Sequence, residues 1–288
     1  MSEIENYISP RQLEDAVRTL ADGNVTVLCG GTDLALQTET GQRPYARTLM
    51  NIRRIERMSG ITAVDGQVRI GALTTVTQIM ENDLIRTSLP VLAETADCFA
   101  SDQIRNAASI GGNICNASPA GDMIIPLMVL DASVELASWK DGGITTRIVP
   151  LDGFFTGPGR TTRQDNELLT AVLFNMPNQG FTACFKKSGP RPALEIAAVS
   201  MAIGGAMIEG HLRHVRAVMG AVGPTPLRAH KLEANLEGKL LDAAMIKQAA
   251  ELAVEDARPI DDIRASTWYR NHLIRVYAEE LLHRVAEN

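Results

Sequence analysis

Aromatic residues and excess positive charge are both scarce in this sequence. Phe, Trp and Tyr together make up 4% of the 288 residues, and the formal net charge is −6. Proteins that bind nucleic acid usually present a basic surface, and those that bind single strands also stack bases on aromatic side chains. We therefore expect no nucleic-acid partner.

The cysteines and histidines are few and dispersed. Cys29, Cys98, Cys115 and Cys184 include no C-x-x-C pair. Of the five histidines, His211 and His214 are three residues apart, but they lie in an expected strand, and the others stand alone. Zinc sites and iron–sulfur clusters need several such ligands close together. The sequence predicts that this chain alone binds no metal.

Long apolar runs are missing as well. The most apolar stretch, residues 197–208, is too short to cross a bilayer and contains two glycines. The first six residues are acidic and do not resemble a signal peptide. We expect a cytoplasmic protein without a membrane span.

Common catalytic and nucleotide motifs do not occur. The sequence has no Walker A loop, no G-x-G-x-x-G fingerprint and no G-x-S-x-G, S-x-x-K or H-x-x-E-H pattern. No nucleophile paired with a base is visible, so we predict no catalytic side chain. Any chemistry would then be supplied by a bound cofactor.

Two glycine-containing segments are the most informative features present. Residues 27–33 read Val-Leu-Cys-Gly-Gly-Thr-Asp, and residues 109–122 contain Gly111, Gly112, Gly121 and many polar side chains. Glycine lets backbone amides approach a ligand, and consecutive amides can bind an anion. The alternatives are a tight structural turn for the first segment and an irregular loop with Asx turns for the second. Two such segments indicate a ligand with a long phosphate-bearing body. Cys29 and Cys115 lie inside these segments, so we expect them to line the ligand site.

The remaining pattern predicts mixed helix and sheet. Apolar spacing predicts helices at residues 9–22, 33–40, 74–80, 90–99, 242–257 and 266–286. Strands are expected at residues 25–29, 168–175, 181–187, 197–208 and 211–222, and hairpins across Asp65-Gly66 and residues 141–143. A turn-rich break at residues 177–180 suggests a domain boundary.

Several motifs in order resemble one family. They are residues 29–33, 103–106, 109–114, 116–122, 153–159, 167–169 and 223–229. The chain resembles the FAD-binding subunit of the molybdenum hydroxylases, the family of xanthine dehydrogenase and of the medium subunit of carbon monoxide dehydrogenase. The likeness covers nearly the whole chain.

The resemblance implies an α+β fold like that of vanillyl-alcohol oxidase (PCMH type). The FAD-binding domain would be residues 1–177, with subdomains of about 1–56 and 57–177. Residues 178–288 would form a C-terminal antiparallel sheet packed with helices. The implied FAD-contacting residues are Val27, Leu28, Cys29, Gly30, Gly31, Thr32, Asp33, Leu34, Ile104, Ala108, Ser109, Gly111, Gly112, Asn113, Cys115, Asn116, Gly121, Asp122, Leu169, Phe185 and Lys186.

Lys186 and Lys187 are neighbours in an expected strand, so they should lie on opposite faces. By similarity Lys186 would lie near the flavin ring edge, where a cation stabilises the reduced flavin. Lys187 is expected to be a surface lysine.

The resemblance also implies partners. A molybdopterin-containing large subunit and a [2Fe-2S] small subunit would deliver electrons to FAD, which would pass them to NAD, oxygen, a quinone or a carrier. The family pattern is a heterohexamer, two heterotrimers paired. Two alternatives stay open: a stand-alone FAD-dependent oxidase or dehydrogenase, and a scaffold without flavin. Intact glycines in both segments argue against the scaffold. Ordering a glycine on folding costs more conformational entropy than ordering other residues, and a protein without a ligand would gain nothing in return.

Overall fold

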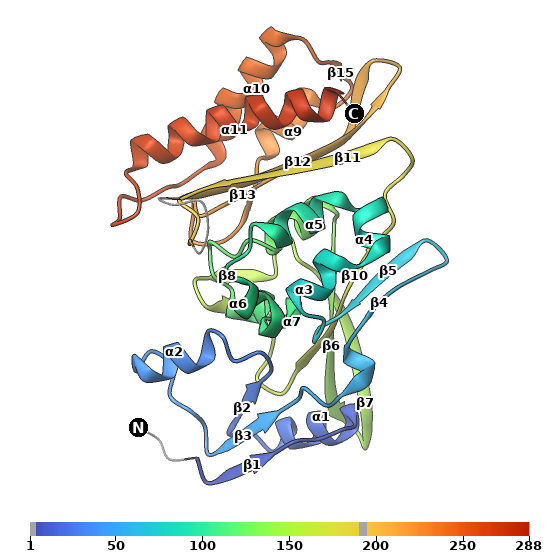
Figure 1. Ribbon diagram of the computed structural model, residues 1–288, viewed down its shortest axis with the longest axis vertical. Coiled ribbons are helices and arrows are strands. Elements are labelled where there is room, and N and C mark those ends of the chain that lie inside the picture. The colour runs from blue at the N-terminus through green and yellow to red at the C-terminus, as the bar shows by residue number, and fades with distance from the viewer. Residues whose placement is uncertain (1–3, 190–194, 288) are drawn as a thin grey trace.

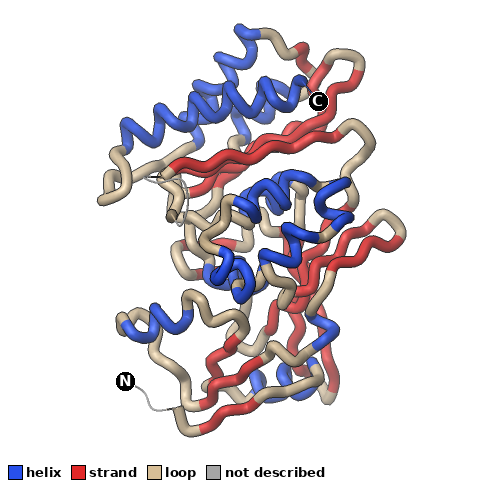
Figure 2. The backbone as a smooth tube through the Cα atoms, viewed as in Figure 1, coloured by secondary structure: helices blue, strands red, loops and turns tan. Residues whose placement is uncertain are grey.

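Three units of mixed helix and strand follow one another along the longest axis of the molecule (Figure 1). The computed structural model describes residues 4–189 and 195–287. Chain order matches spatial order, with the first unit at one end and the last at the other (Figures 1 and 2). The α+β class expected from the sequence is confirmed.

The first unit is a small parallel sheet. Its order is β1 (Asn6–Ile8), β3 (Thr48–Asn51), β2 (Val25–Leu28). The helix α1 (Leu13–Ala21) connects β1 to β2 and buries one stripe of its surface, formed by Leu13, Ala16, Val17 and Leu20. Its apolar spacing is the reason that the sequence predicts a helix in this region.

The predicted start of that helix is wrong. Ser9 and Pro10 precede α1, which begins at Leu13 after an extended Gln12 with φ −107° and ψ 144°. The cause is tertiary, because pairing of β1 with β3 as far as Ile8 keeps the chain extended there. After β2 the chain turns into the short helix α2 (Leu34–Glu39).

The second unit is a five-stranded antiparallel sheet. Its order is β4, β5, β10, β6, β7, with bounds β4 (Ile61–Val64), β5 (Gln67–Gly71), β10 (Leu168–Asn175), β6 (Ser133–Lys140) and β7 (Gly143–Pro150). Both predicted hairpins form. Asp65 and Gly66 have φ of 50° and 77°, the left-handed values that a tight two-residue turn requires.

Helices of the second unit lie between β5 and β6 in the chain. They are α3 (Val76–Glu81), α4 (Asp83–Ser88), α5 (Pro90–Asp97), α6 (Asp102–Ala107), α7 (Ile110–Asn116) and α8 (Ile124–Val129). A 3₁₀ turn (Glu56–Met58) and the short pair β8 (Phe155–Gly157) and β9 (Arg160–Thr161) complete the unit. The first two units share one hydrophobic core.

One of these helices corrects the sequence interpretation. The second glycine segment, for which the sequence predicts no helix, contains α7. Ser109 caps it by accepting a hydrogen bond from the Gly112 N–H, and the Gly111 N–H donates to the Ala72 carbonyl. Each of the two glycines in the first turn, Gly111 and Gly112, disfavours a helix by up to about 1 kcal/mol, so this close packing overrides local propensity.

The third unit is the antiparallel sheet expected at the C-terminus. Its strands are β11 (Phe181–Ser188), β12 (Val199–Ile208), β13 (His211–Gly220), β14 (Leu227–Arg228) and β15 (Lys239–Leu240). One face carries α9 (His230–Leu236), α10 (Ala243–Asp256) and α11 (Thr267–Glu287), which share a second apolar core with it. The other face lies towards α5 (Figure 1), and its strands also contact α8. Within the described ranges, no helix combines the length and apolarity needed to cross a membrane.

Candidate cofactor site

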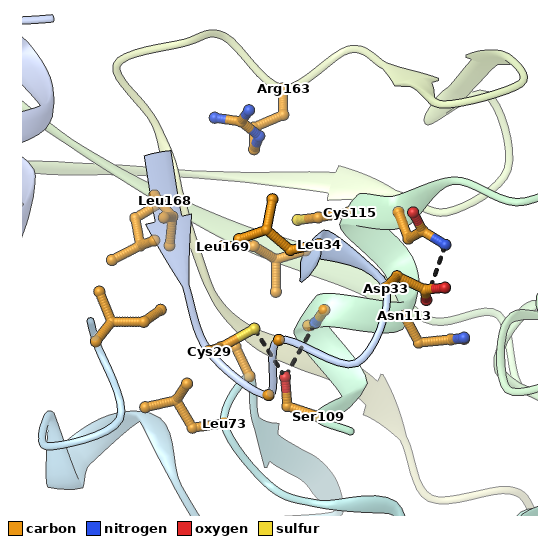
Figure 3. Close-up of a pocket in the computed structure, with 18 of the residues that line it drawn as sticks. Cys29, Asp33, Leu34, Leu73, Ser109, Asn113, Cys115, Arg163, Leu168 and Leu169 are labelled. Atoms are coloured by element: carbon orange, nitrogen blue, oxygen red, sulfur yellow. Dashed lines mark hydrogen bonds between the residues drawn. The ribbon is translucent and has the colours of Figure 1, made fainter. Parts of the chain in front are cut away.

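A cavity of about 370 Å³ opens where the first unit meets the second. Figure 3 shows three walls: the turn after β2, the helix α7, and the chain entering β10. The volume falls in the range of small-molecule sites, roughly 300–1,000 Å³. Both glycine segments singled out in the sequence contribute to it.

The turn after β2 forms the first wall. Gly31 has φ +74°, which any residue with a Cβ would adopt only under strain. Ala35 N–H bonds to the Gly31 carbonyl and thereby begins α2. Across the described residues, the backbone N–H groups of Gly31, Thr32 and Asp33 donate to no protein acceptor. Three free amides in succession suit an anionic ligand.

The need for glycine at position 30 comes from packing within the protein and not from a ligand. A Cβ at this position would overlap the backbone carbonyl of Ala107, and one at Gly111 would lie 2.7 Å from the Ala72 side chain. Close packing against Ala107 requires glycine at position 30, and close packing against Ala72 requires glycine at position 111, with or without a ligand. At these two positions, an intact glycine is therefore no evidence against a scaffold role, contrary to the expectation from the sequence.

The helix α7 forms the second wall. Ser109 Oγ donates to Cys29 Sγ at 3.3 Å and accepts from the Gly112 N–H at 3.2 Å, which joins this wall to the first (Figure 3). Asn113 lines the cavity one turn further on, and its buried Oδ1 has no hydrogen-bond partner among the described residues. A ligand hydroxyl would satisfy this buried acceptor.

An ion pair supports the third wall. Arg147 Nε lies 2.5 Å from Glu167 Oε1, and the Gln164 N–H donates to Glu167 Oε2 at 2.7 Å. Burial raises the pKa of Glu167, but the bonds from Arg147 and Gln164 outweigh this, and the pKa is lowered overall. A negative Glu167 therefore holds the strand that presents Leu168 and Leu169 to the cavity.

Two cysteines line the cavity, as predicted. Burial raises the pKa of Cys115 to about 11, despite the opposing charges of Arg163 and Arg43. The thiol is therefore neutral near pH 7, which fits a lining role without thiol chemistry. Cys29 is held by Ser109 as described above.

Most of the predicted site residues meet at this cavity. Its lining includes Val27, Cys29, Gly30, Gly31, Thr32, Asp33, Leu34, Ala108, Ser109, Gly111, Gly112, Asn113, Cys115, Asn116 and Leu169. Leu28, Ile104, Gly121, Asp122, Phe185 and Lys186 are not among the lining residues.

The two lysines of β11 do lie on opposite faces. Lys186 pairs with Glu280 of α11, on the helical side of the third unit. Lys187, expected on the surface, is buried: its side chain is 7% exposed and lies 2.7 Å from Asp122 Oδ2. The surface assignment is wrong because the second unit covers this face of β11, which sequence alternation cannot reveal.

Several lining residues escaped the sequence analysis. They are scattered over five stretches of the chain and include Leu20, Asn24, Gln37, Arg43, Leu73, Phe99, Arg163 and Leu168. Only Leu168 belongs to a motif noted in the sequence, that of residues 167–169, and the others carry no recognisable chemical signature. For residues such as Arg163, only the fold brings them beside the glycine segments.

Comparison with known proteins assigns the family. Residues 2–177 match the FAD binding domain in molybdopterin dehydrogenase, and residues 183–285 match the CO dehydrogenase flavoprotein C-terminal domain. The chain is 32% identical over 285 residues to the xanthine dehydrogenase FAD-binding subunit of Escherichia coli O157:H7, covering 98% of this chain and 96% of that one. It is 28% identical over 268 residues to the carbon monoxide dehydrogenase medium chain of Hydrogenophaga pseudoflava, covering 92% and 91%.

A solved structure agrees in fold. Reconstituted CO dehydrogenase from Oligotropha carboxidovorans superimposes with a TM-score of 0.93 at 28% identity, covering 100% of this chain and 99% of that chain. The chain thus belongs to the FAD-binding subunits of the molybdenum hydroxylases, and it is an oxidoreductase component whose cofactor is FAD.

The cavity fits this cofactor. Free amides at residues 31–33 suit a diphosphate, the unpartnered Asn113 Oδ1 suits a sugar or ribityl hydroxyl, and the apolar Leu168 and Leu169 suit a ring system. When bound, FAD supplies the transfer of one or two electrons. The chain's own residues would bind and orient it.

Proposed function

We propose that this chain is the electron-transfer subunit of a multi-subunit molybdenum hydroxylase or dehydrogenase. Electrons would arrive from a [2Fe-2S] subunit, which receives them from a molybdopterin-containing large subunit. They would leave from FAD to an external acceptor: NAD, oxygen, a quinone or a carrier protein. The observation that carries the proposal is the FAD-fitting cavity in a chain that matches such subunits over nearly its whole length.

The proposal assigns FAD contacts by wall. The turn of residues 29–34 would hold the diphosphate through backbone amides, and α7 would hold the sugar-like portion through Ser109 and Asn113. Leu169 would pack against the flavin ring. Residues 1–177 would form the FAD-binding domain and residues 178–288 a C-terminal domain, in a cytoplasmic heterohexamer.

The test begins with the purified chain and FAD. Titration should give saturable binding with one FAD per chain and the two visible absorption bands of an oxidised flavin. The tagged chain should then co-purify with an iron–sulfur subunit and a molybdopterin subunit. In that complex, the organic substrate should reduce the FAD.

Two results would overturn the proposal. Failure of FAD to bind both the chain and the assembled complex would leave only a scaffold role. Reduction of FAD by an organic substrate in the isolated chain would instead identify a stand-alone dehydrogenase.

A further inference from the structure

The helix α2 forms part of the cofactor site although it is weakly attached to the protein. None of its residues is buried, and Leu36 on its outer side is 60% exposed. Leu34 and Gln37 nevertheless line the cavity. A helix without buried side chains receives little hydrophobic stabilisation, so other contacts must hold it in place.

Asn116, the last residue of α7, supplies such contacts. Its Nδ2 donates to Asp33 Oδ2 at 3.1 Å, and its Oδ1 accepts from Gln37 Nε2 at 2.7 Å. One side-chain amide thus uses both its donor and its acceptor on α2 and the residue before it. Figure 3 shows the bond to Asp33 at the edge of the cavity.

The other end of this connection is rigid. The helix α7 buries Ile110, Gly111 and Ile114 in the shared core, and Ser109 fixes its start. Ala117 then adopts φ 47° and ends the helix directly after Asn116. Asn116 therefore connects a firmly packed element to a weakly packed one.

We propose that Asn116 is a positioning residue that keeps α2 closed against α7 and so retains FAD. It acts through Asp33 and Gln37, in what we call the Asn116 bridge, and not by contacting the cofactor. This inference rests on the proposed function, because it concerns the same cavity. Opening of α2 would withdraw Leu34 and Gln37 from the cavity wall and misplace the free amides of residues 31–33.

An exchange of the two side chains tests the bridge. Asn116→Asp places two carboxylates against each other, while the swap Asp33→Asn/Asn116→Asp restores an amide that donates to a carboxylate. Gln37 can donate to the bridge in both variants. Since a hydrogen bond to a charged group contributes about 1.5–3 kcal/mol, we expect Asn116→Asp to speed FAD release at least about tenfold. The swap should return the rate to within about threefold of wild type.

The measurements are FAD dissociation by stopped-flow fluorescence and amide hydrogen exchange of residues 34–43 in the FAD-free protein. Exchange should be faster in Asn116→Asp and restored in the swap. Glu39→Gln is the matched control, because Glu39 lies on the exposed side of α2 and should change neither quantity.

The outcomes separate the hypotheses. If the swap releases FAD as fast as Asn116→Asp, Asn116 or Asp33 acts on FAD directly and the bridge is refuted. Wild-type release and exchange rates in Asn116→Asp would refute it too. Because hydrogen exchange is measured without FAD, the bridge can be judged even if FAD binding, and with it the proposed function, fails.

Discussion

The ammonium group of Lys187 lies 2.7 Å from the carboxylate of Asp122, and both side chains are more than nine-tenths buried. The pair joins β11 of the third unit to the chain just before α8 in the second. The other carboxylate oxygen, Asp122 Oδ1, has no hydrogen-bond partner among the described residues. Lys187 is therefore the main group that offsets the cost of burying this charge. Burial raises the pKa of Asp122 even beside this cation.

Breaking this pair should be costly. Lys187→Met leaves Asp122 buried without a counter-charge, and we expect a loss of about 3–5 kcal/mol in the free energy of unfolding, measured by urea denaturation. The double variant Lys187→Met/Asp122→Leu should recover much of that loss. Lys186→Met is the control: its pair with Glu280 is partly exposed, so less than about 1 kcal/mol should be lost. Equal losses for the two lysines would contradict the assignment.

Gly30→Ala should damage the site from within the protein. The added methyl would overlap the Ala107 carbonyl and push the turn after β2 away from the end of α6. Overpacking of this kind costs about 1–3 kcal/mol, and FAD affinity should fall as well. Gly143→Ala is the matched control, since its Cβ would meet no atom within 4 Å. Thermal unfolding and FAD titration check both effects, and an unaffected Gly30→Ala protein would show that Gly30 and Ala107 are not in close contact.

Glu167 should contribute to stability in a pH-dependent way. Its folded-state pKa is lowered, so its stabilisation is complete above the ordinary value of 4.5 and is lost as the pH falls through the folded-state pKa. We expect Glu167→Gln to lose about 1–2 kcal/mol at pH 7 and progressively less in acid. Urea unfolding at several pH values measures this. A constant difference between pH 7 and pH 3 would show that ionisation of Glu167 is not responsible.

Cys115 should report on occupancy of the cavity. Its raised pKa, about 11, predicts slow alkylation at pH 8, and bound FAD should slow it further because Cys115 lines the cavity. Exposed Cys98 lies outside the cavity and serves as an internal control. Peptide mass spectrometry after iodoacetamide treatment gives both rates. Protection of Cys98 and Cys115 to the same degree would point to a global effect of FAD.

The predicted role of Lys186, stabilising the reduced flavin, remains a hypothesis that can be tested. Its side chain contacts Glu280 and lies 5.4 Å from the ring centre of Tyr277. If its charge also stabilises reduced flavin, Lys186→Met should lower the flavin midpoint potential, measured by spectroelectrochemical titration. An unchanged potential would limit Lys186 to the contact between β11 and α11.

Local sequence patterns were sufficient for much of the fold. The α1 stripe, the hairpin at Asp65-Gly66 and the long strands β12 and β13 follow from apolar spacing and turn chemistry, which act over a few residues. The same holds for the glycine segments, because a backbone that must approach a ligand or another backbone closely needs glycine at that point. The sequence therefore predicted the segments that form two walls of the cavity.

Tertiary structure decided what depends on distant partners. The segment at Gly111 folds as a helix because Ser109 and Ala72 hold it, against its own propensity. Arg163 lines the cavity because the chain before β10 passes beside it, and nothing in the local sequence indicates this. Lys187 is buried, and its neighbour is not, because one face of β11 meets the second unit. Burial and pairing are properties of surfaces that meet in space, so a linear pattern cannot specify them.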